Sequence, residues 1–201
     1  LAGGRLFSWV SVLDDEITSP QSSYIENQID FGNDPYDSSD KPLLTSGGME
    51  IIDDGNAGGS SLYSEVFAYE VLYRCELADL LKTETEIEYI DDQGTITDLL
   101  VTIDGEKIGV SVTRAVAFPF DEPYTVQQAA DLLTDKLQDV QASSQNVEAT
   151  DAWVKQILHV IAYAPGHEDS VETAYGELDP ALKADTILWV TVTNGDDQFL
   201  Y

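Results

Sequence analysis

Residues 95–114 have the sequence TITDLLVTIDGEKIGVSVTR, in which two runs of mostly apolar or β-branched residues flank the dipeptide Asp104–Gly105. A two-residue type I′ turn needs positive φ at both central positions, and Asp–Gly is among the pairs that adopt it most readily. The stretch therefore predicts a β-hairpin in which Ile103 lies opposite Glu106. In this register the numbers of paired residues add to 209, so that Asp98 faces Ser111.

The same register predicts two different faces for the hairpin. Residues two apart on a strand share a face, and so do cross-strand partners. Asp98, Ser111 and Thr113 are therefore expected together on one face. The opposite face is mostly core and carries Thr97, Leu99, Val101 and Ile103 against Ile108, Val110, Val112 and Arg114. A carboxylate buried without partners is costly, so we expect Asp98 to reach solvent, hydrogen-bond donors or a cation.

Outward from the hairpin, periodicity and turn signals predict further elements. We expect a helix from Ser64 to about Leu81 and three strands over Glu84–Ile90, Thr95–Ile103 and Lys107–Arg114. Thr125 and Gln128 form a capping box for a helix to about Val140. Helices over Asp151–Tyr163 and Val171–Leu178 and a buried strand over Thr186–Thr193 follow. The order helix, three strands, helices, strand predicts an α/β (α+β) fold with a mixed central sheet.

The composition changes near residue 60. Residues 6–13 form one apolar run, and residues 30–60 are rich in Gly, Asp, Ser and Pro. We therefore predict that residues 1–60 are an N-terminal extension, in which a short strand or helix packs on the body and a long irregular loop follows. Residues 61–201 are predicted to form the main domain.

The charge of the chain is strongly negative: 38 Asp and Glu face 9 Lys and Arg, a net charge of −29 in 201 residues, while 43% of residues are hydrophobic. The apolar content supports a folded core, so the acidic groups lie on its surface. Such a charge repels phosphate backbones and disfavours nucleic-acid binding. Three interpretations stay open: a surface adapted to high salt, an acidic face that docks on a basic protein or mimics nucleic acid, and incidental acidity.

Targeting patterns are few. The sequence has no apolar stretch long enough for a membrane span and no signal-peptide pattern, so we expect no membrane association and an intracellular location, cytoplasmic or nuclear. Cys75 is the lone cysteine and cannot form an internal disulfide. With two histidines and one cysteine, a zinc site is not expected.

Three stretches resemble a known group of proteins. They are IGVSVTRA at 108–115, LLTDKL at 132–137 and KQILHV at 155–160. They are similar to a group, found mainly in microbial eukaryotes, within the PD-(D/E)XK nuclease-like superfamily, and the resemblance covers roughly residues 61–195. It implies a restriction-endonuclease-like core. It also implies a site in which a helix Glu, a strand Asp and the first residue of the (D/E)-x-K triplet hold Mg²⁺, while the Lys positions or activates water.

Carried onto this chain, the resemblance is incomplete. Asp98 matches the strand Asp, and Glu65 or Glu70 matches the helix Glu. These two glutamates are five residues apart, about 140° around a helix, so only one can face Asp98 directly. Ser111 stands where the second acid belongs, and Thr113 stands where the lysine belongs. Two of the roles tied to the triplet are therefore missing.

Two classes of function remain open. The first is a PD-(D/E)XK nuclease-like protein with a degenerate or lapsed metal-dependent phosphodiesterase site; if active, it would be a Mg²⁺-dependent nuclease that holds the metal weakly through Asp98 and Glu65 or Glu70. The second is an acidic interaction protein that binds a basic partner. Lys155, Gln156 and His159 would form one polar stripe of the predicted 151–163 helix, either as support for the site or as a half-exposed face with a hydrogen-bonded histidine.

Overall fold

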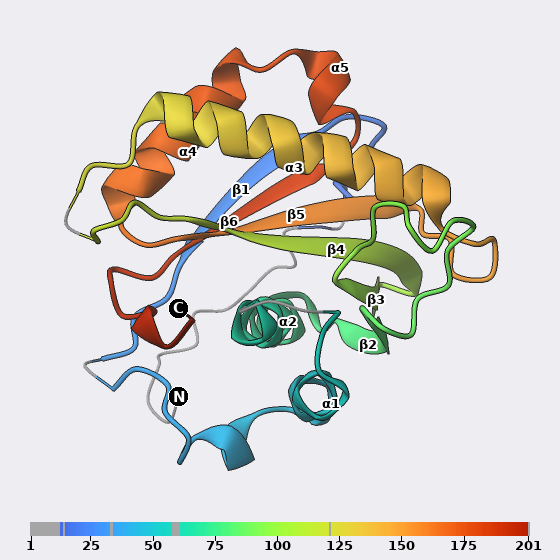
Figure 1. Cartoon of the computed structure of the whole chain (residues 1–201), viewed down its shortest axis with the longest axis horizontal. Helices are drawn as coiled ribbons and strands as arrows, with labels where there is room; N and C mark the ends of the chain where they lie inside the picture. Colours follow the sequence, from blue (N-terminus) through green and yellow to red (C-terminus); the bar gives the residue numbers. More distant parts are fainter. Residues whose placement is uncertain (1–12, 14, 33, 58–60, 121, 201) are drawn as a thin grey trace.

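The computed structural model describes residues 13–200 except 14, 33, 58–60 and 121, and its centre is a six-stranded sheet with the order β1-β6-β5-β4-β3-β2 (Figure 1). The strands are β1 (Ser23–Gln28), β2 (Asp79–Thr83), β3 (Leu99–Ile103), β4 (Glu106–Ala115), β5 (Lys155–Ala162) and β6 (Ile187–Val192). Strands β1, β6, β5 and β4 run parallel, whereas β3 and β2 are antiparallel to their neighbours. The fold is therefore a mixed α/β fold with a mixed sheet, as predicted.

Helices cover both faces of this sheet. They are α1 (Ser46–Asp54), α2 (Leu62–Glu76), α3 (Val126–Asn146), α4 (Pro165–Glu177) and α5 (Pro180–Lys183), with short 3₁₀ turns η1 (Lys41–Leu43) and η2 (Gln198–Leu200). α3, α4 and α5 lie on one face, and α1 and α2 lie on the other (Figure 1). Among the described residues, no helix is long and apolar enough to cross a membrane.

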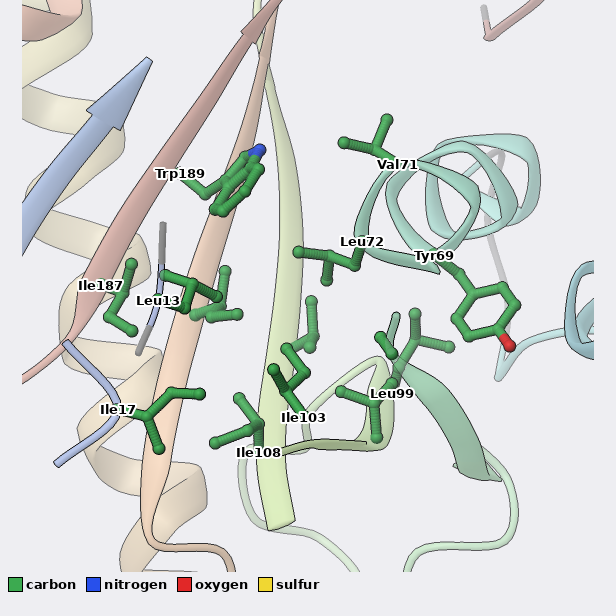
Figure 2. Close-up of a cluster of buried hydrophobic side chains, with 14 of the residues drawn as sticks. Leu13, Ile17, Tyr69, Val71, Leu72, Leu99, Ile103, Ile108, Ile187 and Trp189 are labelled. Atoms are coloured by element: carbon green, nitrogen blue, oxygen red, sulfur yellow. The ribbon is translucent and has the colours of Figure 1, made fainter. Parts of the chain in front are cut away.

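Each face of the sheet has its own hydrophobic core. On the α2 side, Leu72 packs with Leu99 and Ile108 of the hairpin and with Trp189 of β6 (Figure 2). On the α3 side, Leu133 and Leu137 pack against the opposite faces of β5 and β6. Every residue of β5 and β6 is buried, because these central parallel strands are covered on both faces.

The hairpin forms in the predicted register. Five pairs from Leu99↔Val110 to Ile103↔Glu106 add to 209, and Asp104 and Gly105 have φ of 53° and 86°. A glycine is needed inside β4 for another reason, since a Cβ on Gly109 would lie 2.8 Å from the Trp153 ring. The capping box of Thr125 and Gln128 and the buried strand β6 also form as predicted.

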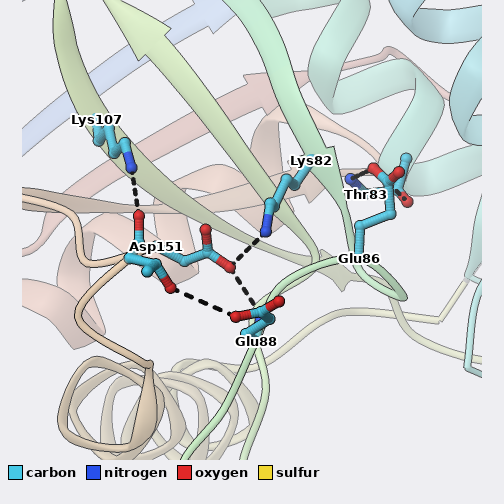
Figure 3. Close-up of polar contacts among 7 residues, drawn as sticks. Lys82, Thr83, Glu86, Glu88, Lys107 and Asp151 are labelled. Carbon is cyan, nitrogen blue, oxygen red and sulfur yellow. Dashed lines mark hydrogen bonds and ion pairs between the residues drawn. The ribbon is translucent and has the colours of Figure 1, made fainter.

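The predicted helix over Asp151–Tyr163 is wrong. Its residues form strand β5, which pairs in parallel with both β4 and β6. A short apolar run is consistent with a buried strand or a buried helix, and periodicity alone does not separate them. Asp151 does not begin a helix but accepts hydrogen bonds from Lys82 Nζ at 2.7 Å and Glu88 N at 2.8 Å, tying β2 to the loop before β5 (Figure 3).

Several predicted boundaries are also wrong. The helix predicted to reach Leu81 ends at Glu76, and Asp79–Thr83 forms strand β2 instead. The predicted strand over Glu84–Ile90 is absent, apart from a bridge between Tyr89 and Val147. The next predicted strand begins at Leu99 rather than Thr95. Thr97 does not point to the same side as Leu99, as strand alternation would require, because its hydroxyl donates to Ser143 Oγ on α3 at 2.9 Å.

The N-terminal region is more ordered than expected. The predicted irregular segment 30–60 contains α1, whose Thr45 side chain caps its first turn, and the chain before it supplies edge strand β1. Leu13 and Ile51 are fully buried in the core on the α2 side. The described part of residues 1–60 therefore packs into the same body as the rest. The apolar run predicted over 6–13 lies outside the described residues except Leu13.

Candidate functional site

Asp98 lies directly before β3, where β3 and β4 separate. Lys107 O and Ala115 O of β4 accept hydrogen bonds from the β5 side, so the backbone groups of the even-numbered β4 residues point toward β3. Val112 lies beyond the last β3 pair, and its N–H donates to Asp98 Oδ2 at 2.6 Å instead. The Asp98 carboxylate therefore takes the place of a missing strand partner at the edge of β4.

This position makes Asp98 an unusual acid. Burial raises its pKa from the ordinary value to about 7, and the negative charges of Glu65 and Glu84 act in the same direction. The Val112 N–H and the charge of Lys136 on α3 favour the ionised form but do not offset the burial. Asp98 is thus poised between its two protonation states near neutral pH.

Glu65, in the first turn of α2, is the second acid of this site. Its side chain is 1% exposed, and Oε1 accepts a hydrogen bond from Asn56 Nδ2 at 3.1 Å. Oε2 is buried and has no hydrogen-bond partner among the described residues. Burial is the main reason why the pKa of Glu65 is raised, and Glu84 adds to it. A buried carboxylate oxygen without a donor favours a proton or a cation beside it.

Glu70 has a different role from Glu65. Its Oε1 accepts hydrogen bonds from Thr45 N at 2.7 Å and Thr45 Oγ1 at 2.8 Å, and its Oε2 pairs with Arg74 at 2.7 Å. These contacts tie the N-terminus of α1 to α2. Of the two predicted glutamates, Glu65 is the one whose charge acts on Asp98, whereas Glu70 is already occupied by structural contacts.

Ser111 and Thr113 lie on the α3 side of β4. Ile108 and Val110 point into the core on the α2 side, so the alternating residues Ser111 and Thr113 point the other way. Ser111 is buried and Thr113 is partly exposed. The Asp98 carboxylate contacts the backbone of β4, and charges on both α2 and α3 act on its pKa.

The predicted polar stripe of Lys155, Gln156 and His159 does not form, because these residues are on a strand. Lys155 Nζ donates to the loop carbonyls Ser19 O at 2.5 Å and Gln21 O at 3.2 Å. Gln156 Nε2, on the opposite face of the strand, donates to α3, including Ser144 Oγ at 2.7 Å. His159 Nε2 and Thr191 Oγ1 are 2.8 Å apart. Burial lowers the pKa of His159 to about 3, so this histidine is neutral at physiological pH.

Sequence reasoning missed three neighbours of the site: Asn56, Glu84 and Lys136. Asn56 and Glu84 lie in segments without regular structure, and Glu84 Oε2 accepts a hydrogen bond from Ala57 N at 2.5 Å. No spacing rule links such positions to Asp98. Lys107, four residues before Ser111, is engaged elsewhere, because its Nζ donates to Thr150 O at 2.7 Å (Figure 3).

A second group of carboxylates does not include Asp98 or Glu65. Glu50, Asp54 and Glu86 are exposed, and each has an oxygen within 4.8 Å of the others. Thr83 donates hydrogen bonds to Asp54 and Glu86. These three acids are close enough to contact one cation, but their exposure means that water can solvate them equally well.

Comparison with known proteins finds a related sequence and a distantly similar structure. No family model matches the chain. The AAC-rich mRNA clone AAC4 protein of Dictyostelium discoideum is 40% identical over 164 residues, which are 78% of this chain and 24% of that protein. The chain therefore spans about a quarter of the length of this relative. SfsA of Pyrococcus furiosus, solved in complex with Ca²⁺, aligns at 12% identity over 67% of this chain and 58% of that one, with a TM-score of 0.28.

Proposed function

We propose that this chain is a PD-(D/E)XK nuclease-like domain whose metal-dependent phosphodiesterase site, at Asp98 and Glu65, is degenerate. The observation that supports it most is the pair of partly or fully buried acids with raised pKa values, one of which has an unpartnered carboxylate oxygen. Such a pair destabilises the fold unless a proton or a cation is present. Costly acids of this kind are typical of functional sites.

The side chains present fit a weakly held divalent cation. Mg²⁺ prefers hard oxygen ligands and is often bound by one or two carboxylates while it keeps several waters. Asp98 Oδ1 and Glu65 Oε2 are the oxygens that would hold it, since Asp98 Oδ2 and Glu65 Oε1 already accept hydrogen bonds. The cation would supply charge neutralisation and activation of water at a phosphodiester.

The same geometry argues against efficient cleavage. Ser111 and Thr113 provide neither a carboxylate nor a cation, and they point toward α3. Loss of one electrostatic stabiliser typically costs about a hundred- to a thousand-fold in rate, and two are replaced here. The net charge of −29 also repels a phosphate backbone. We therefore propose slow residual cleavage at most, or binding without turnover.

Calorimetric titration with Mn²⁺ and Mg²⁺ tests the metal site directly. We expect weak binding that is lost in Asp98→Asn and in Glu65→Gln but kept in Glu70→Gln, because Glu70 serves the α1–α2 contact. The variant Glu50→Gln tests whether metal binds instead to the exposed group of Glu50, Asp54 and Glu86. Binding that survives both Asp98→Asn and Glu65→Gln but disappears in Glu50→Gln would place the metal at the other cluster and contradict the proposal.

Cleavage assays test how much phosphodiesterase activity the proposed site retains. The protein is incubated with single- and double-stranded DNA and RNA in Mg²⁺ or Mn²⁺, at low and at molar KCl. We expect slow cleavage or none, with any product dependent on metal and absent in Asp98→Ala. Rapid turnover that depends on Asp98 would show that another residue has replaced the missing lysine.

A further inference from the structure

Strand β1 leaves one edge of the sheet open. Ser23 N donates to Thr186 O and Ile29 N donates to Val192 O, so the odd-numbered residues of β1 bond to β6. In a strand the backbone groups of alternate residues point to opposite sides. The N–H and C=O groups of Tyr24, Glu26 and Gln28 therefore point outward, and among the described residues no other strand pairs with them.

A groove of about 410 Å³ lies beside this edge, between β1 and α4. It is lined by Tyr24, Glu172, Thr173, Tyr175, Gly176 and Glu177. The Tyr24 and Tyr175 rings both line it and are 5.5 Å apart between centroids. The Tyr175 ring already contacts one ammonium group, because Lys183 Nζ lies 4.5 Å from its centroid.

The groove and the edge are surrounded by acids. Glu172 and Glu177 line the groove and are exposed, and Glu26 is exposed on β1 itself. Buried Glu168 accepts a hydrogen bond from the Tyr24 hydroxyl. Burial and the charges of Glu168, Glu172 and Glu26 together raise the pKa of Tyr24, which shows that these acids act on one spot.

We infer that the outer edge of β1 and the adjoining tyrosine–glutamate groove bind an extended, basic segment of a partner protein. The segment adds a strand beside β1, bonds to the backbone of Tyr24, Glu26 and Gln28, and places a lysine or arginine in the groove. Strand addition supplies affinity through main-chain hydrogen bonds, while the side-chain groove supplies specificity. This inference goes beyond the proposed function and does not depend on it.

Charge favours a basic peptide segment over a second copy of the chain or a nucleic acid at this edge. A second copy of the chain pairing through β1 would bring two sets of these glutamates together, each on a molecule of net charge −29. A nucleic acid would meet the same repulsion. A single charged residue on an edge strand commonly prevents self-association. Glu26 is an exposed charge of this kind on β1, and it would attract a lysine placed opposite on an added strand.

The probe is a short capped peptide of alternating Thr and Lys, titrated into the full chain at low salt and followed by fluorescence anisotropy and hydrogen exchange. We expect saturable binding that slows exchange of the amides of residues 24–28. The double variant Glu26→Lys, Glu172→Lys should weaken binding by about ten-fold or more. The double variant Asp135→Lys, Glu148→Lys changes exposed acids elsewhere by the same charge and should change binding by less than about two-fold.

Four outcomes would overturn the inference. Equal weakening by the two double variants would mean attraction by net charge alone. Equal binding of a peptide in which Pro replaces each Thr would rule out strand pairing, because proline has no N–H. A dimer formed through β1, or tighter binding of an oligonucleotide than of the peptide, would identify a different occupant. Asp98→Asn should bind the peptide as the unmodified chain does, which separates this test from that of the metal site.

Discussion

At the scale of single residues, Asp98 makes a hydrogen bond that the fold needs, but its ionised form lowers the stability of the fold. It accepts the Val112 N–H that the late start of β3 leaves without a strand partner, yet burial and Glu65 oppose its charge. The pKa of Asp98 is about 7 in the fold, above its value in an unfolded chain. The ionised form therefore costs stability, and this cost is absent at acid pH and complete above neutrality.

The first prediction concerns Asp98→Asn. An amide oxygen can still accept the Val112 N–H but carries no charge. Relative to the unmodified chain, the variant should have about the same free energy of unfolding near pH 4. The variant should gain roughly 2–4 kcal/mol by pH 8, with the lower figure allowing for the part of Asp98 that solvent reaches. Denaturant unfolding at several pH values in the presence of a chelator measures this.

Two controls accompany that measurement. Asp92→Asn changes an exposed acid in a turn and should give a difference near zero at every pH. His159 acts with the opposite sign: its pKa of about 3 means that stability falls as pH drops below the ordinary histidine value, because the unfolded chain then takes up a proton. This contribution is common to both proteins and cancels in their difference. A difference that is constant with pH would contradict the placement of Asp98.

At the scale of elements, Glu70 joins two helices. It is 5% exposed and accepts two hydrogen bonds from Thr45 at the start of α1, while its other oxygen pairs with Arg74. The helices approach closely here, since a Cβ on Gly48 would lie 2.4 Å from Glu70 Oε1. Glu70 therefore helps to hold α1 on the body, together with the buried Ile51 of α1.

The second prediction is that Glu70→Ala loosens α1. Removing an acceptor that serves several partly buried donors should cost about 2–4 kcal/mol of unfolding free energy. Hydrogen exchange should speed up over residues 46–54 more than over α3. Asp53→Ala removes an exposed ion pair with Lys41 at 3.8 Å and should cost no more than about 1 kcal/mol. Equal exchange in α1 and α3 of Glu70→Ala would show that α1 is held by other contacts.

At the scale of the whole molecule, charge dominates. A net charge of −29 on 201 residues repels itself, and ion pairs such as Lys82–Asp151 neutralise few of the acids. Added salt screens this repulsion, since the Debye length falls from about 10 Å at 0.1 M to about 3 Å at 1 M. The three interpretations of the acidic surface differ in how much stability depends on this screening.

The third prediction is therefore a melting temperature that rises with KCl. Between dilute buffer and 1 M KCl we expect an increase of about 5 °C or more, because 1 kcal/mol corresponds to roughly 2–4 °C for a domain of this size. Most of this rise should come at the low-salt end of the range, where the Debye length changes most with added KCl. A neutral osmolyte at equal osmolality serves as the control. An unchanged midpoint would contradict adaptation to high salt and favour a specific acidic docking face.

The sequence by itself determined the elements whose signals are local. The Asp104–Gly105 turn sets the hairpin register through backbone φ, and Thr125 with Gln128 begins α3 through its own hydrogen bonds. The apolar and β-branched run of 186–193 was enough for β6. From these, the mixed α/β fold and Asp98 as a candidate could be predicted, because each depends on residues that are near one another in the chain.

Only the tertiary structure decided the rest. The run from Lys155 is a strand because β4 and β6 offer hydrogen bonds on both sides, which periodicity does not report. The charge of Glu65 acts on Asp98, whereas Glu70 bonds to Thr45 and Arg74. Helix α1 lies in the turn-like segment 30–60 and edge strand β1 precedes it, and contacts with residues far along the chain hold both in place. Long-range packing outweighs weak local propensity at these positions.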